Sequence, residues 1–202
     1  MKYLIIGAGG TGGVVGYFMT KAGKDVTLIA RGRHLEAMKK HGLTLERLWD
    51  PNPETIEVKA TDMEHYEERP DVILVCVKGY SLEDTVSFIR RVAKPDTIVI
   101  PILNIYGTGA KLQKELPELL VTDGCIYVSA NIKEPGVLLQ HGKILRIVYG
   151  VREKAEERPE LEQIRQDFTD SSIDGILSEN IRREALEKFS YVSPIGAAGL
   201  YC

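Results

Sequence analysis

The feature that most constrains this chain is a glycine-rich segment that directly follows a short apolar run. Residues 3–6 read Tyr-Leu-Ile-Ile, and the next six form a G-x-G-x-x-G motif. The run predicts a strand buried on both faces, and apolar residues at helical spacing predict a helix over 11–22. In this arrangement backbone N–H groups at the helix N-terminus face a pyrophosphate. The candidate binding residues are Gly7, Ala8, Gly9, Gly10, Thr11 and Gly12.

The segment after the second predicted strand, residues 26–30, indicates which dinucleotide would bind. NAD-binding chains usually place an acid there for the ribose 2′-hydroxyl, whereas this chain has Arg31 and Arg33. Cations at this place suit the 2′-phosphate of NADP. Two alternatives stay open: the motif is a glycine-rich turn without a dinucleotide, and the two arginines only begin a surface helix.

Strand and helix patterns alternate through the first two thirds of the chain. Strands are expected at 71–77 and 97–100, and helices at 34–41, 81–92 and 108–119. A two-stranded insertion is expected at 43–45 and 55–59, separated by Pro51-Asn52-Pro53. Strands at 125–130, 136–139 and 144–149 and a helix over 153–168 follow. This order predicts an α/β fold, a Rossmann-like parallel sheet with antiparallel strands at an edge.

The last predicted helix, residues 179–200, suggests a second domain. Its apolar positions are Ile181, Leu186, Phe189, Val192, Ile195, Ala197 and Leu200. A helix this apolar normally packs on protein. We therefore expect an NADP-binding domain over 1–177, and we expect 178–202 to begin an all-helical domain that continues beyond this chain.

Charge and cysteine content exclude several classes of function. The formal net charge is −3, which offers no cationic field for nucleic acid or for a membrane surface. The three cysteines form no CxxC pair, so neither a disulfide framework nor a metal site is expected. No apolar run is long enough for a membrane span. These features indicate a cytoplasmic protein.

Several segments, in order and spacing, resemble the ketopantoate reductase (2-dehydropantoate 2-reductase) family. They are ARGRHLEAMKKHGLTL, VILVCVKGYSLEDTV, ILNIYG, GCIYVSANIKEPGVLLQHGKILRIVYG and EALEKF. The resemblance implies that Arg31 binds the 2′-phosphate and that Lys78 is a cation beside the cofactor. It also implies that Ala130 contacts NADP through its backbone, Asn104 lies between nicotinamide and substrate, and Lys188 is catalytic.

Each residue whose role the resemblance implies also has a purely structural interpretation. Lys188 would then be a solvated lysine on a charged helix, Lys78 a strand cap, and Asn104 a turn residue before Gly107. We expect Leu186 and its apolar neighbours to face protein, with Lys188 on another side of the helix.

The resemblance implies reduction of a 2-keto acid with NADP(H), with ketopantoate as the first candidate substrate. Val192 and Gly196 stand where the family usually has Asn, and these two departures favour a less polar substrate. A further departure is Ile105, which follows Asn104 where the family usually has Gly. The alternatives are a related NADP-dependent 2-hydroxy acid dehydrogenase and a non-catalytic NADP-binding module. The oligomeric state stays open, with a homodimer as one candidate.

Overall fold

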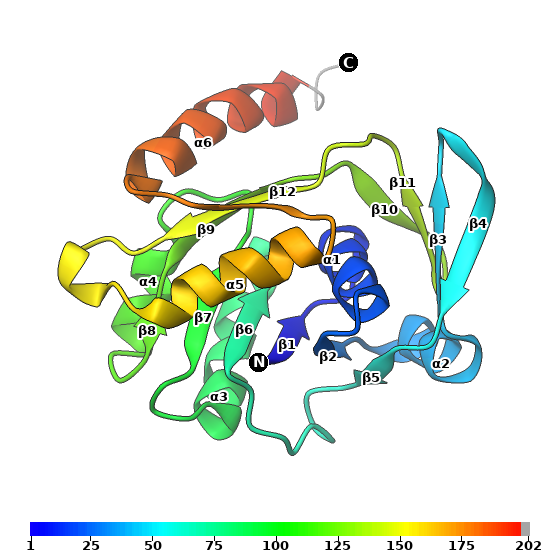
Figure 1. Ribbon diagram of the computed structural model, residues 1–202, viewed down its shortest axis with the longest axis horizontal. Coiled ribbons are helices and arrows are strands. Elements are labelled where there is room, and N and C mark those ends of the chain that lie inside the picture. The colour runs from blue at the N-terminus through cyan, green and yellow to red at the C-terminus, as the bar shows by residue number, and fades with distance from the viewer. Residues whose placement is uncertain (199–202) are drawn as a thin grey trace.

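The computed structural model describes residues 1–198 and contains a six-stranded parallel sheet (Figure 1). In spatial order its strands are β5 (Lys59–Thr61), β2 (Asp25–Ile29), β1 (Lys2–Ile6), β6 (Val72–Val75), β7 (Ile98–Pro101) and β8 (Leu120–Val121). The helices are α1 (Gly10–Lys21), α2 (Gly32–His41), α3 (Leu82–Val92), α4 (Thr108–Glu115), α5 (Pro159–Asp170) and α6 (Ile181–Ala198), with 3₁₀ turns η1 (Gly79–Ser81) and η2 (Lys154–Glu156). No helix in residues 1–198 has the length and apolarity to cross a bilayer. The expectations for Leu200 and Cys202 lie outside the described residues.

Two smaller sheets accompany the parallel one. The first has the order β10 (Ala130–Glu134), β11 (Val137–Gln140), β3 (Leu43–Arg47) and β4 (Asp50–Ile56). The second has the order β13 (Asp174–Leu177), β12 (Arg146–Gly150) and β9 (Asp123–Tyr127). The α/β class with a Rossmann-like parallel sheet is confirmed. The antiparallel pairs hydrogen-bond in these separate sheets, and β8 and β5 form the edges of the parallel sheet.

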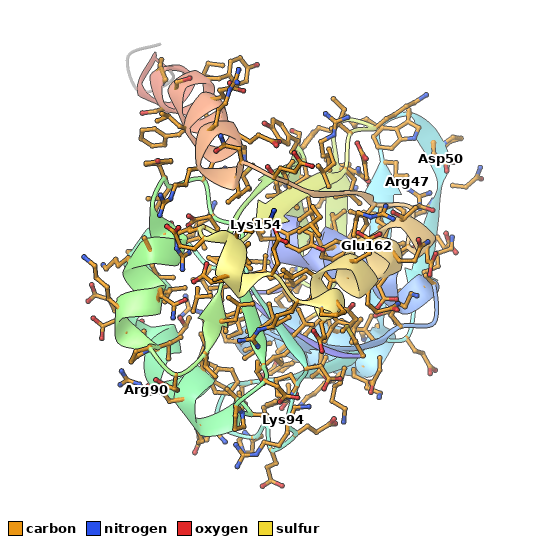
Figure 2. The ribbon with its side chains drawn as sticks, turned by 60° about the vertical axis from the view of Figure 1, so that its left-hand side comes forward. Arg47, Asp50, Arg90, Lys94, Lys154 and Glu162 are labelled. Carbon is orange, nitrogen blue, oxygen red and sulfur yellow. The ribbon has the colours of Figure 1, made fainter. Side chains whose placement is uncertain are left out.

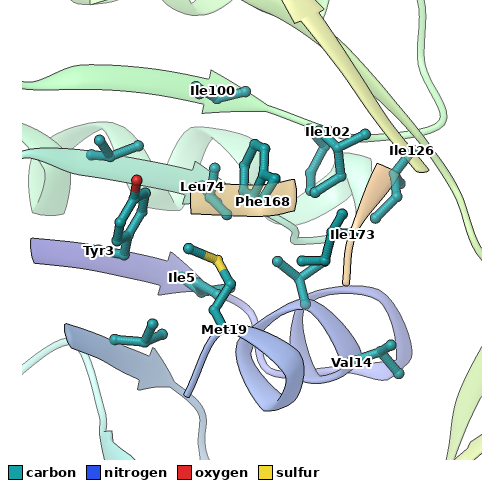
Figure 3. Close-up of a cluster of buried hydrophobic side chains, with 14 of the residues drawn as sticks. Tyr3, Ile5, Val14, Met19, Leu74, Ile100, Ile102, Ile126, Phe168 and Ile173 are labelled. Atoms are coloured by element: carbon teal, nitrogen blue, oxygen red, sulfur yellow. The ribbon is translucent and has the colours of Figure 1, made fainter. Parts of the chain in front are cut away.

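The parallel sheet is covered on both faces, which explains the continuous apolar runs of its strands. Successive residues of a strand point to opposite faces. Tyr3 and Ile5 of β1 therefore join a core with α1 and α5 (Figure 3), and Leu4 and Ile6 join a second core with α3 and α4. Loops follow the carboxyl ends of β1, β2, β6 and β7. These loops carry the candidate functional residues described below.

The insertion differs from the sequence-based expectation. Pro51 and Pro53 lie inside β4 instead of separating two strands, and the hairpin turns at Leu48-Trp49. Arg47 and Asp50 pair across this turn, with Nη1 and Oδ2 3.2 Å apart (Figure 2). Proline is tolerated because β4 is an edge strand, which pairs with β3 alone among the described strands. The expected strand at 55–59 is likewise divided, and β5 joins the parallel sheet instead.

A buried carboxylate ties α5 to the sheet. Asp167, 4% exposed, accepts hydrogen bonds from the Tyr3 hydroxyl at 2.5 Å and from Lys24 Nζ at 2.8 Å. Burial opposes ionisation of Asp167, but the hydrogen bonds from Lys24, Tyr3 and Gln163 outweigh it and lower its pKa. This carboxylate therefore stabilises the fold in its ionised form.

We expect Asp167→Asn to reduce the free energy of unfolding by roughly 2–4 kcal/mol at pH 7, because it breaks a buried charge pair. Since the folded-state pKa lies below the unfolded value, the stabilisation is complete above about pH 4 and is lost as the pH falls through the folded-state pKa. Urea unfolding at pH 7 and pH 3 measures both effects. Asp170→Asn, at an exposed contact of the same Lys24, is the matched control, and equal losses in the two variants would contradict the prediction.

Candidate functional site

The glycine loop, residues 7–12, runs from the end of β1 into the first turn of α1 and is closely packed at three of its four glycines. A Cβ at Gly10 would lie 2.2 Å from the Ala130 carbonyl oxygen, and one at Gly12 would lie 2.2 Å from the Gly7 oxygen. Gly7 itself has φ +102°, a region in which glycine avoids the strain of other residues. A Cβ at Gly9, in contrast, would have no atom of residues 1–198 within 4 Å. The loop therefore fits a phosphate ligand, which would approach the backbone at Gly9.

The loop brings together candidate residues that are distant in the sequence. Ala130, at the start of β10, packs against Gly10, and Thr11 stands in the first turn of α1. That turn has no acidic side chain, so the positive end of the helix dipole is not neutralised there. Ala8 is buried between the loop and β2, where its N–H donates to the Ile29 oxygen at 3.0 Å.

Arg31 lies at the N-cap of α2, two residues beyond the end of β2. Its side chain and that of Arg33 are exposed. Because β2 is the neighbour of β1 in the sheet, this cation stands at the same carboxyl edge as the glycine loop. The position agrees with contact to the adenosine ribose in a parallel sheet of this kind.

The structure brings Asn104 and Lys188 into direct contact, although 84 residues separate them. Lys188 Nζ donates to Asn104 Oδ1 at 2.8 Å and also to the Ile126 carbonyl oxygen. Asn104 follows β7, and Lys188 reaches it from α6, which crosses above β9 and β12 (Figure 1). The ammonium group also lies 5.2 Å from the centroid of the Tyr127 ring.

Lys188 occupies the inner face of α6, which corrects the expected orientation of this helix. Lys188 is only 7% exposed, whereas Leu186 and Phe189 are 49% and 38% exposed. The inner face continues through Ile181 and Val192, at the spacing of one helix stripe. Burial lowers the pKa of Lys188, which makes its ammonium group a stronger acid than that of a solvated lysine.

A small pocket opens beside this contact. It is lined by Leu103, Asn104, Ile105, Tyr106, Gly124, Cys125, Ala185, Lys188, Phe189 and Val192. Its walls are mostly apolar, and its polar groups converge at Lys188 and Asn104. An ammonium group has three donors, and two of those of Lys188 already have partners in the described residues. The third is available to an oxygen acceptor in the pocket.

Lys78 is exposed at the carboxyl end of β6 and is the N-cap of η1. The next residue, Gly79, adjoins the Ile105 side chain, so Lys78 lies on the loop beside Asn104. The structure records no direct contact between Lys78 and Lys188. Within residues 1–198, no three His, Cys, Asp or Glu side chains gather as a metal site would require.

Two residues of the site were not recognised from the sequence. Tyr127 supports the ammonium group of Lys188, and His34 contacts the Ala8 carbonyl oxygen at 2.9 Å. Both lie in segments that carry the family resemblance, His34 in ARGRHLEAMKKHGLTL and Tyr127 in GCIYVSANIKEPGVLLQHGKILRIVYG. That membership was the signal that could have found them, since no residue type or spacing there indicates either contact.

Comparison with known proteins gives a consistent result. The family described as "Ketopantoate reductase PanE/ApbA" matches residues 3–154. A 2-dehydropantoate 2-reductase of Pyrococcus horikoshii is 33% identical over 98% of this chain, which spans 64% of that protein's length. An uncharacterized oxidoreductase of Bacillus subtilis, YkpB, is 24% identical over 96% of this chain and 62% of its own length.

Solved structures share the fold. The 2-dehydropantoate 2-reductase of Porphyromonas gingivalis superimposes with a TM-score of 0.88 at 25% identity, covering 100% of this chain and 72% of that one. A D-mandelate dehydrogenase with NADH and anilino(oxo)acetate has a TM-score of 0.82 at 23% identity, covering 92% of this chain and 59% of its own. At that identity the second likeness concerns the fold alone.

Proposed function

The chain belongs to the PanE/ApbA ketopantoate reductase family, and from this premise we propose that the protein reduces the ketone of a 2-keto acid with NADPH. The first candidate substrate is 2-dehydropantoate, which would yield pantoate. The observation that carries the proposal is the buried Lys188 ammonium group, held 2.8 Å from Asn104 in an apolar pocket. A lysine that belonged only to the solvated surface of the helix would be exposed, whereas Lys188 is buried.

The residues of the pocket suit proton delivery to a ketone oxygen. NADPH, when bound, supplies the hydride that reduces the carbonyl carbon. Negative charge then develops on the ketone oxygen, and Lys188 would donate a hydrogen bond and then a proton to it. Asn104 and the Ile126 carbonyl oxygen hold the ammonium group in place. Desolvation by the surrounding apolar side chains strengthens the interaction of Lys188 with the oxygen.

The dinucleotide would lie along the carboxyl edge of the parallel sheet. The open space at Gly9 and the N-terminus of α1 suit the pyrophosphate. Ala130 stands against this loop, and Lys78 on the β6 loop would add a cation near the cofactor. Arg31 would pair with the 2′-phosphate, which is the basis for proposing NADPH over NADH.

We expect Arg31→Ala to weaken NADPH binding roughly tenfold while NADH binding changes little, because only NADPH carries the 2′-phosphate. Fluorescence titration with both cofactors measures the ratio. Arg69→Ala serves as the control, since Arg69 hydrogen-bonds to Arg91 and Ala93 carbonyl groups away from this edge. Equal affinity of the unaltered protein for the two cofactors would contradict the NADPH preference.

A second candidate function is reduction of a less polar 2-keto acid. It is favoured by Val192, which lines the pocket on the same face of α6 as Lys188, one turn further along the helix. An amide there would offer hydrogen bonds to a polar substrate, each contributing about 0.5–1.5 kcal/mol, whereas valine offers none. NADPH oxidation by the full-length protein with a panel of 2-keto acids, 2-dehydropantoate included, separates the two candidates. Failure of every 2-keto acid would contradict the proposed reaction.

A further inference from the structure

His34 connects two loops that are far apart in the sequence. It stands in the first turn of α2, and its ring Nε2 lies 2.9 Å from the carbonyl oxygen of Ala8 in the glycine loop. On its other side, the backbone N–H of Gly136 donates to ring Nδ1 at 3.0 Å. Gly136 belongs to the turn between β10 and β11, so the imidazole bridges that hairpin to the glycine loop.

The two partners define the protonation of the ring. A backbone N–H only donates, so Nδ1 must accept, and the single ring proton is therefore on Nε2. Nε2–H donates to the Ala8 oxygen. Burial lowers the pKa of His34, so the neutral ring that this arrangement requires is the form present at pH 7. Neither contact is available to an aliphatic side chain.

The Ala8 carbonyl group and the Gly9 N–H belong to one planar peptide group, so a contact that orients the carbonyl group also orients the N–H. The peptides of the described chain are all trans, and in a trans peptide the C=O and the N–H point in opposite directions. The Ala8 N–H is held by the Ile29 oxygen at 3.0 Å, and its carbonyl group is held by His34. The Gly9 N–H therefore has a set direction, at the residue where the loop is open to a ligand.

We propose that His34 is a positioning residue for the dinucleotide site, which holds the Ala8–Gly9 peptide in the orientation that receives the pyrophosphate. This inference rests on the proposed NADPH site. Its effect on binding comes from preorganisation, because a loop that is already ordered loses less entropy when the ligand binds.

The hairpin on the other side of His34 provides a rigid support. Gly136 has φ +81°, and its carbonyl oxygen accepts the Thr44 N–H at 2.9 Å. A Cβ at Gly136 would lie 3.0 Å from the Cβ of Ala37, so the turn is closely packed on α2. The same hairpin touches the glycine loop again where Ala130 meets Gly10. Because His34 hydrogen-bonds to both, it holds the glycine loop in a fixed position relative to this hairpin.

Two variants separate the two hydrogen bonds of His34. In His34→Gln the side-chain NH₂ takes the approximate place of ring Nε2 and keeps the donor to Ala8. In His34→Asn the side-chain oxygen takes the approximate place of Nδ1 and keeps the acceptor for Gly136. We expect His34→Asn to weaken NADPH binding roughly tenfold and His34→Gln to change it less than about threefold, measured by fluorescence titration at pH 7.5. Thermal melting of both variants shows whether each is folded.

The NADPH affinities of the two variants and of the unaltered protein decide whether His34 has this role. Equal NADPH affinity in all three proteins would overturn the role of His34 and leave the proposed function standing. Weaker binding in a folded His34→Gln than in a folded His34→Asn would also overturn it, because the Gly136 contact would then matter instead of the Ala8 contact. If His34→Asn does not fold, a loss of affinity in folded His34→Gln decides against the proposal, and retention supports it. Absence of NADPH binding in the unaltered protein would overturn the proposed function together with this inference.

Discussion

Lys188→Ala is expected to lower kcat by roughly 10²–10⁴-fold while NADPH affinity stays nearly unchanged, because general acid catalysis by a positioned group contributes about that factor. The ammonium group would interact with the ketone oxygen mainly as charge develops there, so its loss should affect kcat more than KM. Steady-state rates of NADPH oxidation, together with a separate cofactor titration, measure the two effects.

The pH dependence offers a second measurement on Lys188. The acid must be protonated to donate, so the rate should fall as the pH rises through the pKa of Lys188. Burial lowers that pKa, and the decline should therefore begin below the pH of about 10.4 at which an ordinary lysine titrates. Lys111→Ala is the matched control, because Lys111 pairs with Glu83 on the exposed surface of α4. Unchanged turnover in Lys188→Ala would identify Lys188 as a structural residue.

Replacing Gly9 and Gly10 by alanine, one at a time, should separate the effect on NADPH binding from the effect on stability. Gly9 has φ −75° and ψ −163° and open space around it, so Gly9→Ala should leave the free energy of unfolding within about 0.5 kcal/mol. The added methyl group would occupy the place where the pyrophosphate approaches the backbone. We expect NADPH affinity to fall roughly 10- to 100-fold, the equivalent of about 1–3 kcal/mol of steric conflict.

Gly10→Ala is the counterpart of that variant. Its Cβ would lie 2.2 Å from the Ala130 carbonyl oxygen, which is backbone and yields only if β10 moves. We expect a loss of roughly 1–3 kcal/mol in the free energy of unfolding. Urea unfolding without ligand and NADPH titration of both variants provide the comparison. A destabilised Gly9→Ala, or one that binds NADPH normally, would contradict the assignment of the open side of the loop.

Local patterns in the sequence were sufficient for the elements that form the sheet. Alternation of apolar runs with helical periodicity predicted β1, β2, β6 and β7 and the helices between them, because burial on both faces leaves a continuous apolar signature. The resemblance named Asn104 and Lys188, and the structure brings both to one pocket. The pairing of strands could not be predicted in the same way. β3 pairs in parallel with β11, a partner more than 90 residues away. No local pattern specifies such a partner.

The sequence by itself determined the glycine loop, the parallel α/β class and the cation after β2, since each depends on neighbouring residues and on short-range geometry. Only the tertiary structure decided which side of α6 faces inward. Apolar content favoured Leu186 and Phe189, but the surface beneath the helix presents the Asn104 amide and the Ile126 carbonyl group, which offset the cost of burying Lys188. A helix turns inward the face that matches its partner surface. That surface is assembled from the loop after β7 and from β9, segments distant from α6 in the sequence, so the pattern of α6 alone does not determine which face turns inward.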